Sequence, residues 1–203
     1  MHQSMSDAAY LYARVRSDAE KLGCSQTLRV LPLARQWHAG QYRKGAQQLP
    51  YITHPLTMAC HALALGFTDD ALLSALLLHD VPEDCGIPVR DLPVDPLTRD
   101  AVALVTFSHL PGESHADAKA RYFAAIREND LACLVKVIDR CHNVSCMAQG
   151  FTRERMAQYV TETDTYVLPL LDALDARRPE YAGALWAIRY QLESLLDTFR
   201  RLL

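Results

Sequence analysis

Long hydrophobic runs, paired cysteine motifs and a strong charge of either sign are all missing from this sequence of 203 residues. Its most apolar stretches, 71–78 and 131–135, fall far short of the roughly 20 residues that a membrane helix needs. Residues 1–7 also lack the basic start and apolar stretch of a signal peptide. We therefore expect a cytoplasmic protein with no membrane partner.

The six cysteines include no CxxC pair, and most lie within helix-like apolar patterns, which indicates reduced core thiols rather than disulfides. A net charge of −3 and a pI near 6.2 argue against a nucleic-acid polymer as partner. Half of the residues are hydrophobic, which excludes a disordered chain. The length suits one globular domain with room for an appended helix.

Glycine is scarce, proline stands mostly at segment edges, and strand signals are weak, so the predicted fold class is an all-α helical bundle. We expect His54 to cap a helix with Pro55 at its first position, and Thr68 to cap the apolar helix that carries 71–78. The predicted division is an accessory helical segment at 1–25, a main domain at 26–176 and an amphipathic C-terminal helix at 177–203. This last helix covers the core or mediates a homodimer.

Four ionisable side chains within six residues follow the apolar stretch 71–78, namely His79, Asp80, Glu83 and Asp84. An aspartate directly after a buried helix is costly unless it is paired or binds a cation. The carboxylates of Glu83 and Asp84 have the chemistry to orient or deprotonate a water. By itself, the Glu83–Asp84 pair fits a solvated acidic turn better than a catalytic site.

A second polar cluster interrupts the apolar helix predicted at 131–147. Asp139 and Asn143 are four residues apart and so share a helix face, and Lys136 and Arg140 repeat that spacing on an adjacent face. A salt-bridged surface would explain this pattern, but the flanking valines and isoleucine indicate burial. A buried aspartate needs a partner.

Two imidazoles and two carboxylates on three separate predicted helices provide the donors of a metal site in a bundle core, namely His54, His79, Asp80 and Asp139. Mixed nitrogen and oxygen donors suit Mn²⁺, Fe²⁺ or Zn²⁺ better than Ca²⁺. Arg43 and Lys44, on a glycine-containing loop, have the charge to meet a phosphate. Cations of this kind also occur in loops for solubility alone.

The sequence resembles the HD-domain metal-dependent phosphohydrolases, and within them the hydrolase domain of RelA/SpoT-type proteins and the stand-alone small alarmone hydrolases. The resemblance covers roughly residues 28–170 and is carried by four ordered motifs, AGQYRK at 39–44, PYITHP at 50–55, LHDVPED at 78–84 and KVIDRCHN at 136–143. It departs from the family pattern at Pro82, Ile138 and Ser145.

The resemblance implies an HD-domain helical bundle with one metal ion, usually Mn²⁺, held by His54, His79, Asp80 and Asp139. It implies that Glu83 and Asp84 form the catalytic acidic pair. Arg43, Lys44 and Asn143 fall on positions that contact the nucleotide, and Arg140, which lies beside them in the sequence, is expected to help bind it. The implied reaction removes the 3′-pyrophosphate of (p)ppGpp and yields GDP or GTP and pyrophosphate.

Two other functions stay open at this point. The first is an HD phosphohydrolase that acts on a different phosphate ester, such as an adenosine alarmone, a nucleotide monophosphate or NADPH. The second is a non-catalytic module that binds an alarmone. The retained Glu83–Asp84 pair argues against a pure binding module, which has no use for it.

Overall fold

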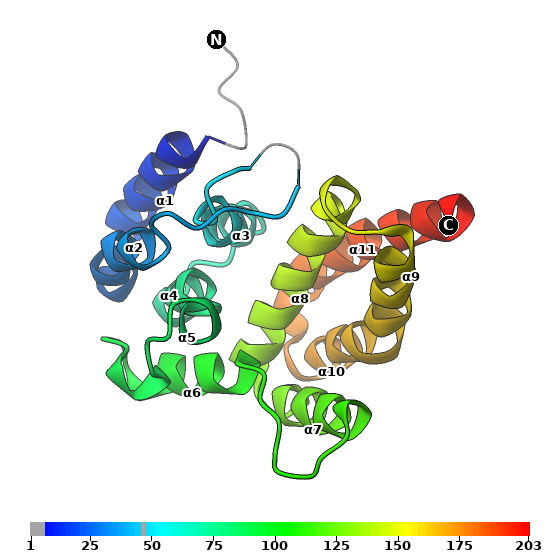
Figure 1. Cartoon of the computed structure of the whole chain (residues 1–203). Coiled ribbons are helices and arrows are strands. Elements are labelled where there is room, and N and C mark those ends of the chain that lie inside the picture. Colours follow the sequence, from blue (N-terminus) through cyan, green and yellow to red (C-terminus); the bar gives the residue numbers. More distant parts are fainter. Residues whose placement is uncertain (1–6, 46–47) are drawn as a thin grey trace.

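Helices make up the regular structure of the computed structural model, which describes residues 7–45 and 48–203 (Figure 1). The predicted all-α class is confirmed, since the isolated bridge between Tyr42 and Pro50 is the sole β contact in these ranges. Residues 1–6 of the predicted N-terminal segment lie outside the described residues. The α-helices are α1 (Ala8–Leu22), α2 (Ser25–Trp37), α3 (Thr53–Ala64), α4 (Asp70–Leu78), α5 (Val81–Asp84), α6 (Pro96–Val105), α7 (His115–Arg127), α8 (Asp130–Cys146), α9 (Arg153–Glu162), α10 (Leu168–Arg177) and α11 (Ala182–Leu202).

Two predicted helix starts are wrong by one or two residues. The carboxylate of Asp69, rather than Thr68, accepts the backbone N–H of Leu72 at 2.8 Å and caps α4. The cap of α3 is Ile52, so that His54 lies inside the first turn. Pro55 is therefore the third residue of α3. It is tolerated there because the first N–H groups of a helix have no partner within it.

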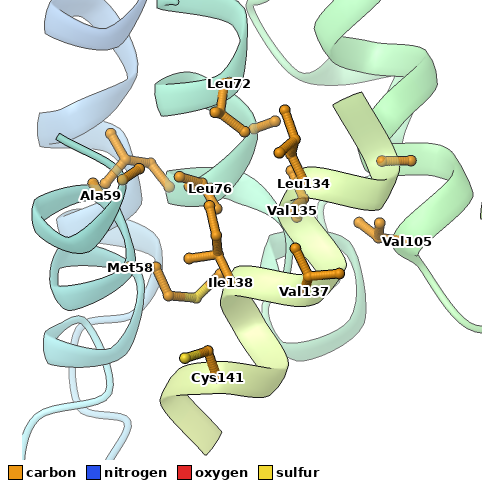
Figure 2. Packing of buried hydrophobic residues seen from close by; sticks show 14 of the residues in the cluster. Met58, Ala59, Leu72, Leu76, Val105, Leu134, Val135, Val137, Ile138 and Cys141 are labelled. Carbon is orange, nitrogen blue, oxygen red and sulfur yellow. The ribbon is translucent and has the colours of Figure 1, made fainter. Parts of the chain in front are cut away.

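Helices α3, α4 and α8 contribute many of the buried core residues. Every residue from Ala71 to Leu78 is buried, as the uniformly apolar pattern of α4 predicts. In Figure 2, Leu76 of α4 lies against Ile138 of α8, with Met58 of α3 beside them. All three of these side chains are fully buried within one hydrophobic cluster.

Helix α8 is the central helix of the fold. It packs against α3, α4, α6, α7, α10 and α11 (Figure 1), and its remaining side faces the cavity described below. Ten of its seventeen residues are buried, among them the charged Asp139 and Arg140. A helix enclosed in this way can present polar groups to two different neighbours.

The two ends of the chain join the same core. Leu11, Val15 and Ala19 of α1 are buried where α1 packs on α2 and α3. The predicted apolar face of α11 is also buried, and it packs on α8, α9 and α10 through Leu185, Ile188, Leu192 and Leu196. Among the described residues, none of the helices is both long and apolar enough to span a bilayer.

Candidate active site

The junction between α4 and α5 places two neighbouring side chains at one point. Helix α4 ends at Leu78, and α5 begins at Val81 with Pro82 in its second position, where a missing N–H costs nothing. In between, the Nδ1 of His79 donates to the carbonyl oxygen of Leu76 at 2.9 Å. A carbonyl only accepts, so in the neutral ring of His79 the lone pair lies on Nε2.

Four side chains from three parts of the chain converge here. The Nε2 atom of His54, on α3, lies 3.2 Å from Nε2 of His79, 3.5 Å from Oδ2 of Asp80 and 3.3 Å from Oδ1 of Asp139 on α8. The Nε2 atom of His79 lies 3.0 Å from Oδ2 of Asp80 and 3.8 Å from Oδ1 of Asp139. The structure thus brings all four predicted ligand side chains together.

These donor atoms fit a divalent metal ion. Donors at about 2.1 Å from an ion stand roughly 3 to 3.5 Å from one another, which is close to the observed separations. His54, His79 and Asp80 alone form a group with metal-site geometry. Burial lowers the pKa of the His79 imidazole, but Asp80 and Asp139 outweigh burial and raise it to about 9. The cluster therefore attracts positive charge.

Asp139 is held on both of its oxygens by its own helix. Its Oδ2 accepts from Nζ of Lys136 at 3.0 Å, and its Oδ1 accepts from Nδ2 of Asn143 at 2.5 Å. Burial by itself would raise the pKa of Asp139, but Lys136 and the imidazoles of His54 and His79 keep it well below its usual range. The carboxylate is therefore ionised and fixed in orientation.

The second carboxylate is fixed by a tyrosine. The hydroxyl of Tyr51 donates to Oδ2 of Asp80 at 2.5 Å, from the loop that precedes α3. Burial and the charge of Asp80 raise the pKa of this hydroxyl, so that it stays protonated and keeps donating. Neighbours of this kind orient ligating carboxylates.

A cavity of about 790 Å³ opens over the two carboxylates. Asp80 and Asp139 line it, whereas the imidazoles of His54 and His79 are almost fully buried. Its wall also carries four cations, namely Arg43, Lys44, Lys136 and Arg155. The volume is that of a ligand pocket for a molecule of nucleotide size, and its charge suits a polyanion.

The loop that carries Arg43 and Lys44 is fastened to the end of α8. The Arg43 guanidinium donates to Oδ1 of Asn143 at 2.9 Å and lies 3.2 Å from the sulfur of Cys146. The backbone also approaches closely, because a Cβ at Gly150 would lie 2.6 Å from the carbonyl oxygen of Lys44. Glycine at this position therefore lets the cationic loop reach the cavity wall.

The predicted catalytic pair is divided. Asp84 lines the cavity, and Glu83 is not among the lining residues. Instead, Oε1 of Glu83 accepts the backbone N–H of Phe107 at 2.6 Å, just beyond the end of α6. Both carboxylates remain on α5, within one turn of Asp80.

Arg140 requires a correction, because the structure does not bring it to the cavity. Its guanidinium is 2% exposed, pairs with Glu162 of α9 and lies 3.8 Å from the centroid of the Tyr159 ring. Consecutive residues of a helix are about 100° apart, so a residue beside Asp139 in sequence faces a different neighbour. The position of Arg140 serves the packing of α8 on α9.

Two residues that contact the site were not singled out from the sequence, namely Tyr51 and His142, and each lies inside a motif that was recognised for another residue. Lys136 was noted for its spacing to Arg140, but its partner is Asp139, three residues away on the same helix. No sequence signal pointed to His142, because its partner His54 is 88 residues away.

The sequence of this chain is similar to sequences of several known proteins. No protein-family model matches the chain. The chain is 30% identical to a GTP pyrophosphokinase of Streptomyces coelicolor over 189 residues, which cover 89% of this chain and 21% of that protein. It is 34% identical to the bifunctional (p)ppGpp synthase/hydrolase SpoT of Escherichia coli over 141 residues, or 64% of this chain and 19% of SpoT.

The chain is similar to the RelA/SpoT-type proteins. It spans about a fifth of the length of the two relatives above. It covers much more of a short relative, the guanosine-3′,5′-bis(diphosphate) 3′-pyrophosphohydrolase MESH1 of Xenopus tropicalis, with 29% identity over 154 residues, 65% of this chain and 77% of MESH1. The resemblance inferred from the motifs is thereby confirmed.

A solved structure agrees in fold. It is that of a metazoan SpoT orthologue that hydrolyses ppGpp, and it matches with a TM-score of 0.63 and 24% identity over 88% of this chain and 95% of that one. The predicted HD-domain helical bundle is therefore confirmed as the fold.

Proposed function

We propose that this chain hydrolyses the 3′-pyrophosphate ester of (p)ppGpp, with Mn²⁺ as the metal ion. One observation carries the proposal, namely that four ligand side chains converge at the floor of a cavity whose wall carries four cations. Relatives named as 3′-pyrophosphohydrolases of guanosine-3′,5′-bis(diphosphate) support it. Fe²⁺ and Zn²⁺ suit the same mixture of nitrogen and oxygen donors.

Each side chain has a definite task in this proposal. His54, His79, Asp80 and Asp139 would hold the ion, which lowers the pKa of a water and offsets charge on a phosphoryl oxygen. Arg43, Lys44 and Lys136 neutralise the pyrophosphate. Asn143 holds both Arg43 and Asp139, which ties the nucleotide side of the cavity to the ligand cluster.

The acidic pair handles the water. Water attacks the phosphorus bonded to the ribose 3′ oxygen, that P–O bond breaks, and the 3′ oxygen takes up a proton from solvent as GDP or GTP leaves with pyrophosphate as the other product. Asp84, on the cavity wall, orients the water and accepts its proton. Glu83 joins it from the same turn of α5 once its carboxylate exchanges the N–H of Phe107 for the water.

The direct test measures pyrophosphate release from ppGpp with Mn²⁺ and after chelation. We expect turnover that needs the ion and falls at least 100-fold in Glu83→Gln and Asp84→Asn, because each variant removes a carboxylate that acts on the water. Asp175→Asn makes the same chemical change at an exposed position outside the cavity and should leave turnover unchanged.

The alternatives give different results. Turnover of an adenosine alarmone, a nucleotide monophosphate or NADPH, with none of ppGpp, would contradict the proposed substrate and keep the enzyme class. Tight binding of ppGpp without turnover would contradict the enzymatic proposal. We also propose a cytoplasmic location, which the six free cysteines favour because thiols stay reduced there.

A further inference from the structure

Both nitrogens of His54 are engaged by α8. On one side of the ring, Nε2 faces the ligand cluster and lies 3.3 Å from Oδ1 of Asp139. On the other side, Nδ1 lies 2.8 Å from Nδ1 of His142, which comes three residues after Asp139 on the same helix. The two rings are tilted by 49° with centroids 4.7 Å apart, so they are not stacked.

The proton between the two rings has one consistent place. A neutral imidazole has a single N–H, and a nitrogen that binds an ion does so through its lone pair. When Nε2 of His54 holds the ion, its Nδ1 carries the proton and donates it. The Nδ1 of His142 is then the acceptor. His79 shows the same arrangement, with its Nδ1 donating to the carbonyl oxygen of Leu76.

We propose that His142 is a positioning residue, which fixes the tautomer and ring orientation of His54 by accepting its Nδ1–H and thereby strengthens metal binding. The proposal rests on the proposed metal site. Partners of this kind typically change metal affinity 10–100-fold when they are removed. An imidazole in this place differs from the carboxylates and backbone carbonyls that usually take the role.

His142 has two other surroundings that suggest a different role for it. His142 lines the cavity, so it could serve the substrate rather than His54. It also lies near Arg43, which belongs to the nucleotide side. Neither explanation requires the Nδ1 of His142 to point at His54, and neither predicts a change in metal affinity in the absence of nucleotide. Metal affinity of the free protein therefore separates the proposed role from both alternatives.

The test measures Mn²⁺ affinity of the whole chain without nucleotide, by the electron paramagnetic resonance signal of free Mn²⁺. We expect His142→Leu to bind Mn²⁺ about 10–100-fold more weakly. His142→Asn should recover most of the affinity, because the amide oxygen of asparagine stands where Nδ1 stands in histidine. His142→Gln, whose amide reaches the Nε2 position instead, should not. His61→Leu removes a neighbouring imidazole on α3 that does not contact His54 and should change nothing.

Activity gives a second readout. We expect turnover of ppGpp by His142→Gln to recover when Mn²⁺ is raised 10–100-fold, with the KM for ppGpp unchanged. Equal Mn²⁺ affinity in the wild type, His142→Leu, His142→Gln and His142→Asn would overturn the role of His142 and leave the metal site standing. An altered KM with unaltered metal affinity would assign His142 to the substrate. A wild type that binds no Mn²⁺ would overturn the site and this inference together.

Discussion

At the scale of single residues, Asp139 carries the most connections in the cavity. Its two oxygens accept from Lys136 and Asn143, and Oδ1 also faces the imidazoles of His54 and His79. It is almost fully buried, so its charge depends on these partners. A change at Asp139 therefore reaches the ion, the cation Lys136 and, through Asn143, the guanidinium of Arg43.

Asp139→Ala is expected to abolish Mn²⁺ binding and ppGpp turnover together, because it removes one ligand and frees Lys136 to repel the ion. Titration with Mn²⁺ and a pyrophosphate-release assay measure the two effects. Asp100→Ala, at an exposed position, is the control. Intact one-to-one binding of Mn²⁺ in Asp139→Ala would contradict its assignment as a ligand.

Arg43→Ala is expected to raise the KM for ppGpp about 10-fold with little change in kcat, because a hydrogen bond to a charged group contributes about 1.5–3 kcal/mol. Steady-state kinetics at saturating Mn²⁺ measure both constants. Arg90→Ala, which removes an exposed arginine on the loop before α6, should leave them unchanged. An unaltered KM with collapsed turnover would show that Arg43 does not serve substrate binding.

At the scale of elements, α8 is joined to α7 and α9 by a partly buried ion cluster. Arg140 of α8 and Lys119 of α7 both pair with Glu162 of α9. Burial alone would raise the pKa of Glu162, but the guanidinium and the ammonium outweigh it and lower the pKa from 4.5 to about 2. The ionised carboxylate thus stabilises the packing of three helices.

The lowered pKa of Glu162 makes the free energy of unfolding depend on pH. A carboxylate with a lowered pKa stabilises the fold above about pH 4.5 and loses the contribution as the pH falls toward 2. The wild type should therefore lose roughly 3 kcal/mol more than Glu162→Gln over this interval, measured by urea unfolding at a series of pH values. At neutral pH, Glu162→Gln should be the less stable protein, because Arg140 keeps a buried charge without its partner.

The control for this effect is Glu193→Gln, which breaks an exposed pair with Arg189 on α11. Surface pairs contribute about 0–1 kcal/mol, so the acid dependence of the control should follow the wild type. Parallel pH profiles of the wild type and Glu162→Gln would show that the ion cluster does not stabilise the packing of α7, α8 and α9.

At the scale of the whole molecule, the hydrophobic core and the ligand cluster share the same helices. α3, α4 and α8 supply Met58, Leu76 and Ile138 to the core (Figure 2). The same three helices and their ends carry the ligand side chains. Close packing leaves these helices little freedom to move against one another. The core therefore holds the donors at the separations that an ion requires.

Leu76→Ala should lower the free energy of unfolding by about 2–5 kcal/mol, because Leu76 is fully buried and its truncation leaves a cavity. Mn²⁺ should still bind in the folded variant, because the carbonyl oxygen that orients His79 remains. Leu97→Ala, at a side chain that is 56% exposed, should cost less than about 0.5 kcal/mol. Urea unfolding at neutral pH measures both, and equal values would contradict the central place of α4.

Hydrophobic periodicity and local side-chain chemistry account for the features that the sequence predicts correctly. The uniformly apolar stretch 71–78 predicts the buried α4, and the amphipathic pattern at 177–203 predicts the buried face of α11. The ordered motifs indicate the fold and the candidate site residues, because the spacing within a motif shows which side chains lie on the same face of a helix. Helix starts were less certain, since Thr68 and Asp69 are both good caps and one position separates them.

The sequence by itself determined the helices, the apolar core and the set of side chains able to hold an ion and a polyanion. Only the tertiary structure decided that His142 meets His54, that Glu83 binds the backbone at Phe107 and that Arg140 turns to α9. The reason is that helical periodicity relates side chains within one helix. Which face meets which neighbour depends on how all the helices pack at once, over separations of up to 88 residues in the contact between His54 and His142.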